Sequence, residues 1–78
     1  MSNIKIDLSI IGLGAASYAA TLYAARYQIP TIMIGADFGG ETATGGLIEN
    51  YPGVPEIDGY DLMLNMKEQV LNYHIETI

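Results

Sequence analysis

A glycine-rich turn lies between an apolar run and an alanine-rich segment near the start of this chain. The turn occupies residues 12–17 with the sequence G-L-G-A-A-S, and the uncharged residues 8–11 precede it. This order predicts a strand, a tight turn, and a helix whose unpaired N–H groups and positive dipole face an anion. Gly12 admits the turn and Gly14 lets phosphate approach the backbone, so the pattern predicts a dinucleotide pyrophosphate site. The alternative is a strand-to-helix turn that is glycine-rich by chance.

Composition narrows the classes of protein that fit. With 78 residues the chain has room for one small domain, whose stability we expect to be marginal. Nine acidic residues against three basic ones give a net charge of −6, which argues against nucleic acid as a partner. The chain has no cysteine, so it carries no disulfide, thiolate metal site or redox dithiol. His74 alone does not make a metal site, and none is predicted.

One uncharged stretch, residues 8–25, needs a comparison with a membrane span. It contains glycine, serine, threonine and six alanines, whereas a spanning helix needs about 20 mostly strong apolar residues. A buried strand followed by a helix of small residues fits better, and the N-terminus lacks a signal-peptide pattern. We therefore expect no membrane association and a cytoplasmic location.

The periodicity predicts a Rossmann-like α/β fold with the order β-α-β-loop-α-β. We expect parallel strands near residues 5–11, 31–34 and 75–78, and helices near residues 14–27 and 60–73, in a three-layer unit. The apolar run before the turn is typical of a central parallel strand that is covered on both faces.

Residues 35–59 form a long segment with no period of a helix or strand. They hold seven of the nine glycines, yet apolar side chains such as Phe38 indicate that much of the loop is held against the body. Asp58 is the predicted N-cap of the second helix. The core-facing side of that helix is predicted to comprise Leu62, Met66, Val70 and Tyr73. His74 is expected to connect that helix to the third strand.

Four local patterns together resemble one family. They are DLSIIGLGAAS at residues 7–17, YAAR at residues 23–26, GGE at residues 39–41 followed by IENYPG at residues 48–53, and IDGYDLM at residues 57–63. In these patterns the chain is similar, over essentially its whole length, to the low-molecular-weight thioredoxin reductases and related two-domain flavoprotein disulfide reductases.

The resemblance implies that residues 1–78 are the N-terminal portion of an FAD-binding domain. Members of this family bind FAD in one domain and NADPH in a second, and pass electrons through a Cys-x-x-Cys pair. The NADPH domain, the dithiol and the C-terminal segment that closes the flavin site are absent from these 78 residues. The implied FAD-binding residues, none of them catalytic, are Gly12, Gly14, Ala15, Ala16, Ser17, Gly35, Gly39, Gly40, Glu41, Ile48 and Asn50.

The chain departs from the family pattern at several of these positions. Ala15 and Ser17 stand where proline and a third glycine are common, and Gly35 stands where many Rossmann sites have an acidic residue for the ribose. Asp37 follows two residues later. Glu41 replaces the usual glutamine and adds negative charge beside a flavin and a diphosphate. We therefore expect FAD binding by these 78 residues alone to be weak or absent.

Three functions are compatible with these observations. The first is the FAD-binding portion of a thioredoxin reductase-like oxidoreductase that is inactive by itself. The second is a non-catalytic, truncated nucleotide-binding or interaction module. The third, a small NAD-binding module, fits the long loop less well. Under the first two functions we expect a second copy or a partner chain to cover an exposed sheet edge.

Overall fold

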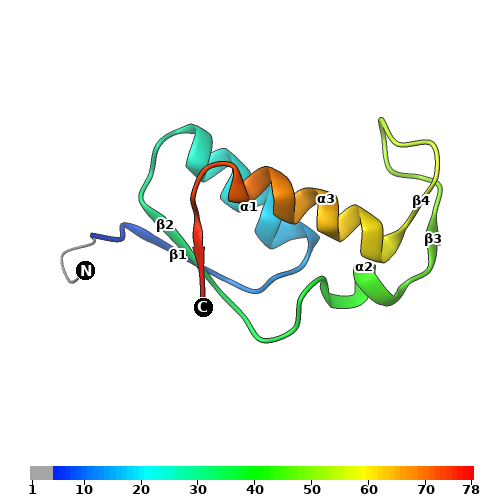
Figure 1. Cartoon of the computed structure of the whole chain (residues 1–78), viewed down its shortest axis with the longest axis horizontal. Coiled ribbons are helices and arrows are strands. Elements are labelled where there is room, and N and C mark those ends of the chain that lie inside the picture. Colours follow the sequence, from blue (N-terminus) through cyan, green and yellow to red (C-terminus); the bar gives the residue numbers. More distant parts are fainter. Residues whose placement is uncertain (1–4) are drawn as a thin grey trace.

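The computed structural model describes residues 5–78 and contains three helices and five strands in that range. Figure 1 shows the two long helices side by side and a hairpin at one end of an elongated molecule of 43 × 24 × 15 Å. In chain order the elements are β1 (Leu8–Ile11), α1 (Ala15–Arg26), β2 (Thr31–Ile34), α2 (Gly40–Thr44), β3 (Leu47–Ile48), β4 (Ile57–Asp58), α3 (Gly59–Leu71) and β5 (Glu76–Thr77).

The main sheet has the order β1-β2-β5, and both strand pairs are parallel, as predicted. Strand β2 has the predicted bounds, whereas β1, which begins at Leu8, and β5, which comprises two residues, are shorter than predicted. Pro30 explains the start of β1. Its carbonyl accepts hydrogen bonds from the N–H groups of both Asp7 and Leu8, and proline has no N–H to extend the ladder backwards.

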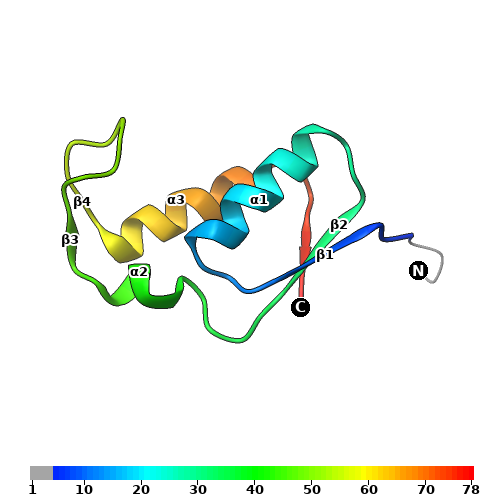
Figure 2. The ribbon, with the colours of Figure 1, turned by 180° about the vertical axis from the view of Figure 1, so that it is seen from behind.

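Helices α1 and α3 contact each other and lie on the same side of the sheet, as the reversed view in Figure 2 also shows. The described residues therefore form two layers, and the prediction of three layers was wrong. The prediction that the first strand is covered on both faces was also wrong, since Ile11 is 73% exposed. The apolar run showed that the strand is hydrophobic on both faces. Residues 5–78, however, cover only one of these faces.

Helix α1 ends in a left-handed residue that is not glycine. Gln28 has φ 62°, its N–H bonds to the Ala25 carbonyl, and the N–H of Ile29 bonds to the Ala24 carbonyl. These two bonds form a Schellman motif, in which glycine is the usual residue at the position of Gln28. His74 adopts the same conformation between α3 and β5, where a connector was predicted.

Helix α3 confirms the predicted N-cap and corrects the predicted core face. The Asp58 carboxylate accepts a hydrogen bond of 3.0 Å from the Tyr60 N–H. Leu62 and Val70 are buried as predicted, whereas Tyr73 is 42% exposed and Met63 is fully buried in its place. The apolar face extends toward Met63 because α2 and the loop after β2 pack there, which helical periodicity alone does not reveal.

The segment predicted to be a long loop contains regular structure. Helix α2 has five residues, and β3 and β4 pair antiparallel in a two-residue ladder. A bridge between Tyr51 and Val54 orders the hairpin tip. These elements are too short to show a period, so the sequence indicated only that the segment is held down. Within residues 5–78, no helix has the length and apolar character needed to cross a membrane.

Candidate functional site

The glycine turn lies at the carboxyl ends of β1 and β2. The Gly12 N–H donates a hydrogen bond of 2.7 Å to the Ile34 carbonyl, which ties the turn to the end of β2. Gly12 has φ 118°, and a β-carbon there would lie 2.8 Å from the Ser17 hydroxyl oxygen. The backbone angle therefore favours glycine at this position, and any side chain there would also have to displace the Ser17 hydroxyl.

The first turn of α1 presents N–H groups to open space. Gly14 is the N-cap, and within the described part of the chain no side chain caps α1 and no acidic residue stands in its first turn. A β-carbon built on Gly14 would meet no atom within 4 Å. The free N–H groups and the helix dipole together make this end of α1 suited to an anion. Ala15 and Ser17 are half-buried there, and Ala16 is exposed.

A second glycine segment lies directly against the turn. The Gly39 N–H donates a hydrogen bond of 2.8 Å to the Leu13 carbonyl. Gly40, with φ 56°, lies so close to the turn that its β-carbon would be 3.7 Å from the Cα of Gly14. The structure thus brings together two sequence patterns that are separated by more than 20 residues.

Leu13 is the residue that joins these segments, and sequence reasoning missed it. It is buried, its carbonyl accepts the Gly39 bond, and its side chain packs on Gly35. A β-carbon on Gly35 would lie 2.7 Å from Leu13 Cγ. A single large apolar residue inside a glycine turn was the available signal, because its only means of burial is to pack against the end of the neighbouring strand.

Two carboxylates stand near the glycine segments. Asp37 lies between β2 and Gly39, Glu41 lies in the first turn of α2, and both are exposed. Neither pairs with a cation among residues 5–78. Each carboxylate repels an anionic ligand at the glycine turn, although exposure to water screens that repulsion.

The two remaining predicted residues lie on the hairpin. Ile48 is in β3 opposite Ile57, and Asn50 lines a cavity formed by residues 49–55 alone. The structure does not bring either one beside the glycine turn, so their assignment to the site stays a prediction.

An aromatic cluster holds the loop that carries Gly39 and Gly40. Phe38 packs edge-to-face between Tyr18 of α1 and Tyr60 of α3, with ring centroids 6.2 and 5.8 Å apart. Lys67 Nζ lies 5.2 Å from the centre of the Phe38 ring. Burial raises the pKa of the Tyr18 hydroxyl above its ordinary value. Phe38 therefore fixes the loop against both long helices, as its apolar character in a glycine-rich segment predicted.

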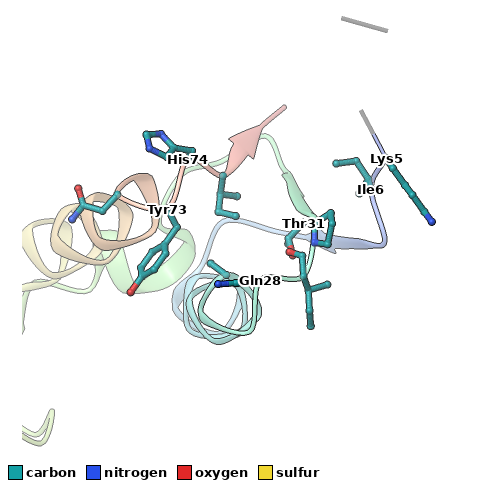
Figure 3. A pocket seen from close by; sticks show the side chains of 11 residues that line it. Lys5, Ile6, Gln28, Thr31, Tyr73 and His74 are labelled. Atoms are coloured by element: carbon teal, nitrogen blue, oxygen red, sulfur yellow. The ribbon is translucent and has the colours of Figure 1, made fainter. Parts of the chain in front are cut away.

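A cavity of about 540 Å³ lies at the other end of the sheet (Figure 3). Its wall includes Ile6 before β1, Thr31 at the start of β2, and Gln28 and His74, which follow α1 and α3. In parallel α/β sheets, ligands bind beyond the carboxyl ends of the strands. This cavity is at the amino ends, so it is not part of the candidate site.

Comparison with known proteins gives one consistent result. No family model matches the chain. It is 46% identical over 72 residues to a thioredoxin reductase of Mycolicibacterium smegmatis, a match that covers 90% of this chain and 23% of the relative. The thioredoxin reductase structures from Streptococcus pyogenes and Lactococcus lactis superpose with TM-scores of 0.90 and 0.88, at 38% and 35% identity. They cover 99% and 95% of this chain, which spans 26% and 25% of theirs.

These matches confirm the resemblance that the sequence motifs indicated. The chain is similar in sequence and in its α/β fold to the N-terminal part of thioredoxin reductases, and it spans about a quarter of the length of the relatives that it matches.

Proposed function

We propose that this chain, a homologue of the N-terminal part of thioredoxin reductases, supplies the pyrophosphate-binding portion of an FAD-dependent oxidoreductase. The observation that supports this proposal is the junction of the two glycine segments, made by the Gly39–Leu13 hydrogen bond and the approach of Gly40 to Gly14. A pyrophosphate at this junction meets bare backbone on both sides and the uncapped start of α1.

The residues at this junction fit a dinucleotide. The space before Gly14 is open, and the N–H groups of residues 15–17 are the donors that would hold the pyrophosphate. Bound FAD supplies the capacity to accept a hydride and release electrons. The residues of this chain bind and orient it, and Asp37 and Glu41 lower its affinity through charge repulsion.

In the complete enzyme, electrons would pass from NADPH through FAD to a disulfide. This chain contributes no thiol because it has no cysteine, and it contains one glycine-rich dinucleotide turn. By itself it should therefore not reduce a disulfide. The alternative is a non-catalytic nucleotide-binding or interaction module, which would use the same turn without passing electrons to a disulfide.

A chimera tests the proposal. The 78 residues are fused to the portion of the Mycolicibacterium smegmatis relative that follows its matched region. We expect the purified chimera to carry flavin absorbance and to reduce a disulfide with NADPH. The separate 78-residue chain with excess FAD is expected to remain at the free-flavin background. A chimera that binds flavin but transfers no electrons would favour the alternative module.

Two matched substitutions locate the cofactor. Gly14→Val places a branched side chain in the open space before α1, so we expect the chimera to lose flavin. Ala20→Val introduces the same side chain at an exposed position of α1 and is expected to keep it. Equal flavin content in the two variants, with unchanged circular dichroism, would show that the pyrophosphate does not lie at the glycine turn.

A further inference from the structure

The start of α3 contains a chemically labile pair of residues. Asp58 and Gly59 are the one place in the 78 residues where an aspartate or an asparagine precedes glycine. In such a pair the backbone nitrogen of the second residue can attack the carboxyl carbon of the first and close a cyclic imide. A side chain on the second residue hinders this attack, and glycine has none.

The fold constrains both members of this pair. The Asp58 carboxylate caps α3 through its bond from the Tyr60 N–H, and aspartate is among the best residues at an N-cap. Gly59 is buried, and the Thr42 carbonyl oxygen occupies the space that a β-carbon there would need. The cap and the close packing together keep a labile sequence at this position.

The structure exposes one reacting group and shields the other. The Asp58 side chain is exposed to solvent, so its carboxyl group is accessible. Gly59 is buried, and its N–H donates a hydrogen bond of 2.8 Å to the Gly46 carbonyl, in the segment between α2 and β3. Ring closure requires this N–H to lose its proton. A buried, hydrogen-bonded N–H loses its proton to solvent only when the structure around it opens.

We propose that Asp58 is a site of spontaneous isomerisation to isoaspartate, blocked in the closed fold and released when Gly59 separates from α2 and Gly46. In the first step the Gly59 nitrogen bonds to Asp58 Cγ and a C–O bond of the carboxyl group breaks. The hydroxyl group and the proton of the nitrogen leave as one water. Water then adds to the main-chain carbonyl carbon of Asp58, and the bond from that carbon to the Gly59 nitrogen breaks. Isoaspartate has the same composition as aspartate, so water is the only co-reactant.

Isomerisation changes the start of α3. The backbone of isoaspartate passes through Cβ and Cγ, so it is one carbon longer, and the free carboxylate moves onto Cα. The Tyr60 N–H then loses its cap, and the Gly59 N–H no longer lies opposite the Gly46 carbonyl. Each opening that leads to hydrolysis in this direction therefore leaves a chain whose α2–α3 junction closes less well.

Incubation of the purified 78-residue chain near neutral pH tests the proposal. Peptide mapping with electron-transfer dissociation distinguishes isoaspartate from aspartate, and Asp61, which precedes leucine in the same helix, is the internal control. Isoaspartate should form at Asp58 at least about tenfold faster in urea, which exposes the Gly59 N–H, than in trimethylamine N-oxide, which favours the folded state. Asp61 should stay unchanged in both solutions.

Two substitutions in α3 leave the labile pair intact and vary its protection. Met63→Ala removes a fully buried side chain that packs beside Gly39, and it should speed isomerisation by more than about tenfold. Leu64→Ala changes a 37% exposed residue and should alter the rate by less than about twofold. Amide hydrogen exchange at Gly59 should change by the same factor as isomerisation in each variant, because both reactions need the same N–H to be exposed.

Two results would overturn the proposal. Equal rates at Asp58 and Asp61 in urea would show that the pair is not an isomerisation site. Equal rates at Asp58 in urea and in trimethylamine N-oxide, or a rate that does not follow hydrogen exchange at Gly59, would show that the fold does not control the reaction.

Discussion

Gly59→Ala should destabilise the fold more than any other glycine-to-alanine change in this chain with an ordinary backbone angle. Gly59 is buried at the start of α3, and a β-carbon there would lie 1.9 Å from the Thr42 carbonyl oxygen of α2. Real β-carbons stay at least 3.0 Å from such atoms, so α2 and α3 must separate by about 1 Å. That shift also stretches the 2.8 Å bond from the Gly59 N–H to the Gly46 carbonyl.

The magnitude follows from three terms. Overpacking at a contact that must move costs about 1–3 kcal/mol, and a weakened backbone hydrogen bond costs up to about 1 kcal/mol. Alanine also lowers the conformational entropy of the unfolded chain, which stabilises the folded state by about 0.4–1 kcal/mol. We therefore expect the free energy of unfolding to fall by roughly 2 kcal/mol.

The chain offers a matched control. A β-carbon on Gly45 would lie 3.6 Å from the same Thr42 oxygen, in ordinary contact, and Gly45 has φ −81°. For Gly45→Ala only the lower entropy of the unfolded chain matters, so its free energy of unfolding should rise by about 0.4–1 kcal/mol. Urea denaturation followed by far-ultraviolet circular dichroism, with trimethylamine N-oxide to support the folded state, measures both variants. If Gly59→Ala is as stable as Gly45→Ala, the close approach of α2 to α3 is not as described.

Three further substitutions should change the stability of the fold in a predictable direction. Gln28→Gly should raise the urea midpoint by the equivalent of about 0.5–1 kcal/mol, because glycine relieves the left-handed angle of φ 62°; a lower midpoint would contradict this. Asp58→Ala should cost about 1 kcal/mol in the same assay through loss of the N-cap bond, whereas Asp61→Ala, which removes a carboxylate from the same helix turn, should cost less. Because the folded-state pKa of Tyr18 is raised, its contribution to stability is complete below the unfolded value of about 10 and is lost as the pH rises through the folded value. Stability measured between pH 8 and 11 should accordingly fall less steeply in Tyr18→Phe than in the unmodified chain.

Local sequence patterns were sufficient for the elements that have a period and a start signal. The glycine turn located the start of α1, and Asp58 located the start of α3. The same patterns gave no information on α2, β3 and β4, which have two to five residues each. Local patterns also could not predict the number of layers. An apolar strand indicates that both of its faces need cover, but it does not show which residues supply that cover.

The candidate site was predictable in part for the same reason. Gly12 and Gly14 were assigned from their spacing and Gly39 and Gly40 from the family resemblance, and the structure places all four at one junction. Leu13 was missed although a large apolar residue inside a glycine turn is a signal, because its role depends on a backbone carbonyl and on a contact with Gly35 that spacing alone does not reveal. Asn50 was assigned to the site by its resemblance to a family motif, and its location on the hairpin leaves that assignment a prediction.

The hydrogen bond between Gly39 and Leu13 couples the order of one segment to the occupancy of another. A ligand at the glycine turn that favours one orientation of the Leu13 peptide also favours the bonded state of Gly39. Thermodynamic linkage makes this effect reciprocal: the bonded state of Gly39 raises the affinity of the turn by the same factor by which the ligand favours that state, so a change that loosens the loop weakens ligand binding. Substitution of Phe38, which lies outside the turn, is then a means of adjusting affinity without altering a single ligand contact, and amide hydrogen exchange at Gly39 becomes a direct report of whether the turn is occupied.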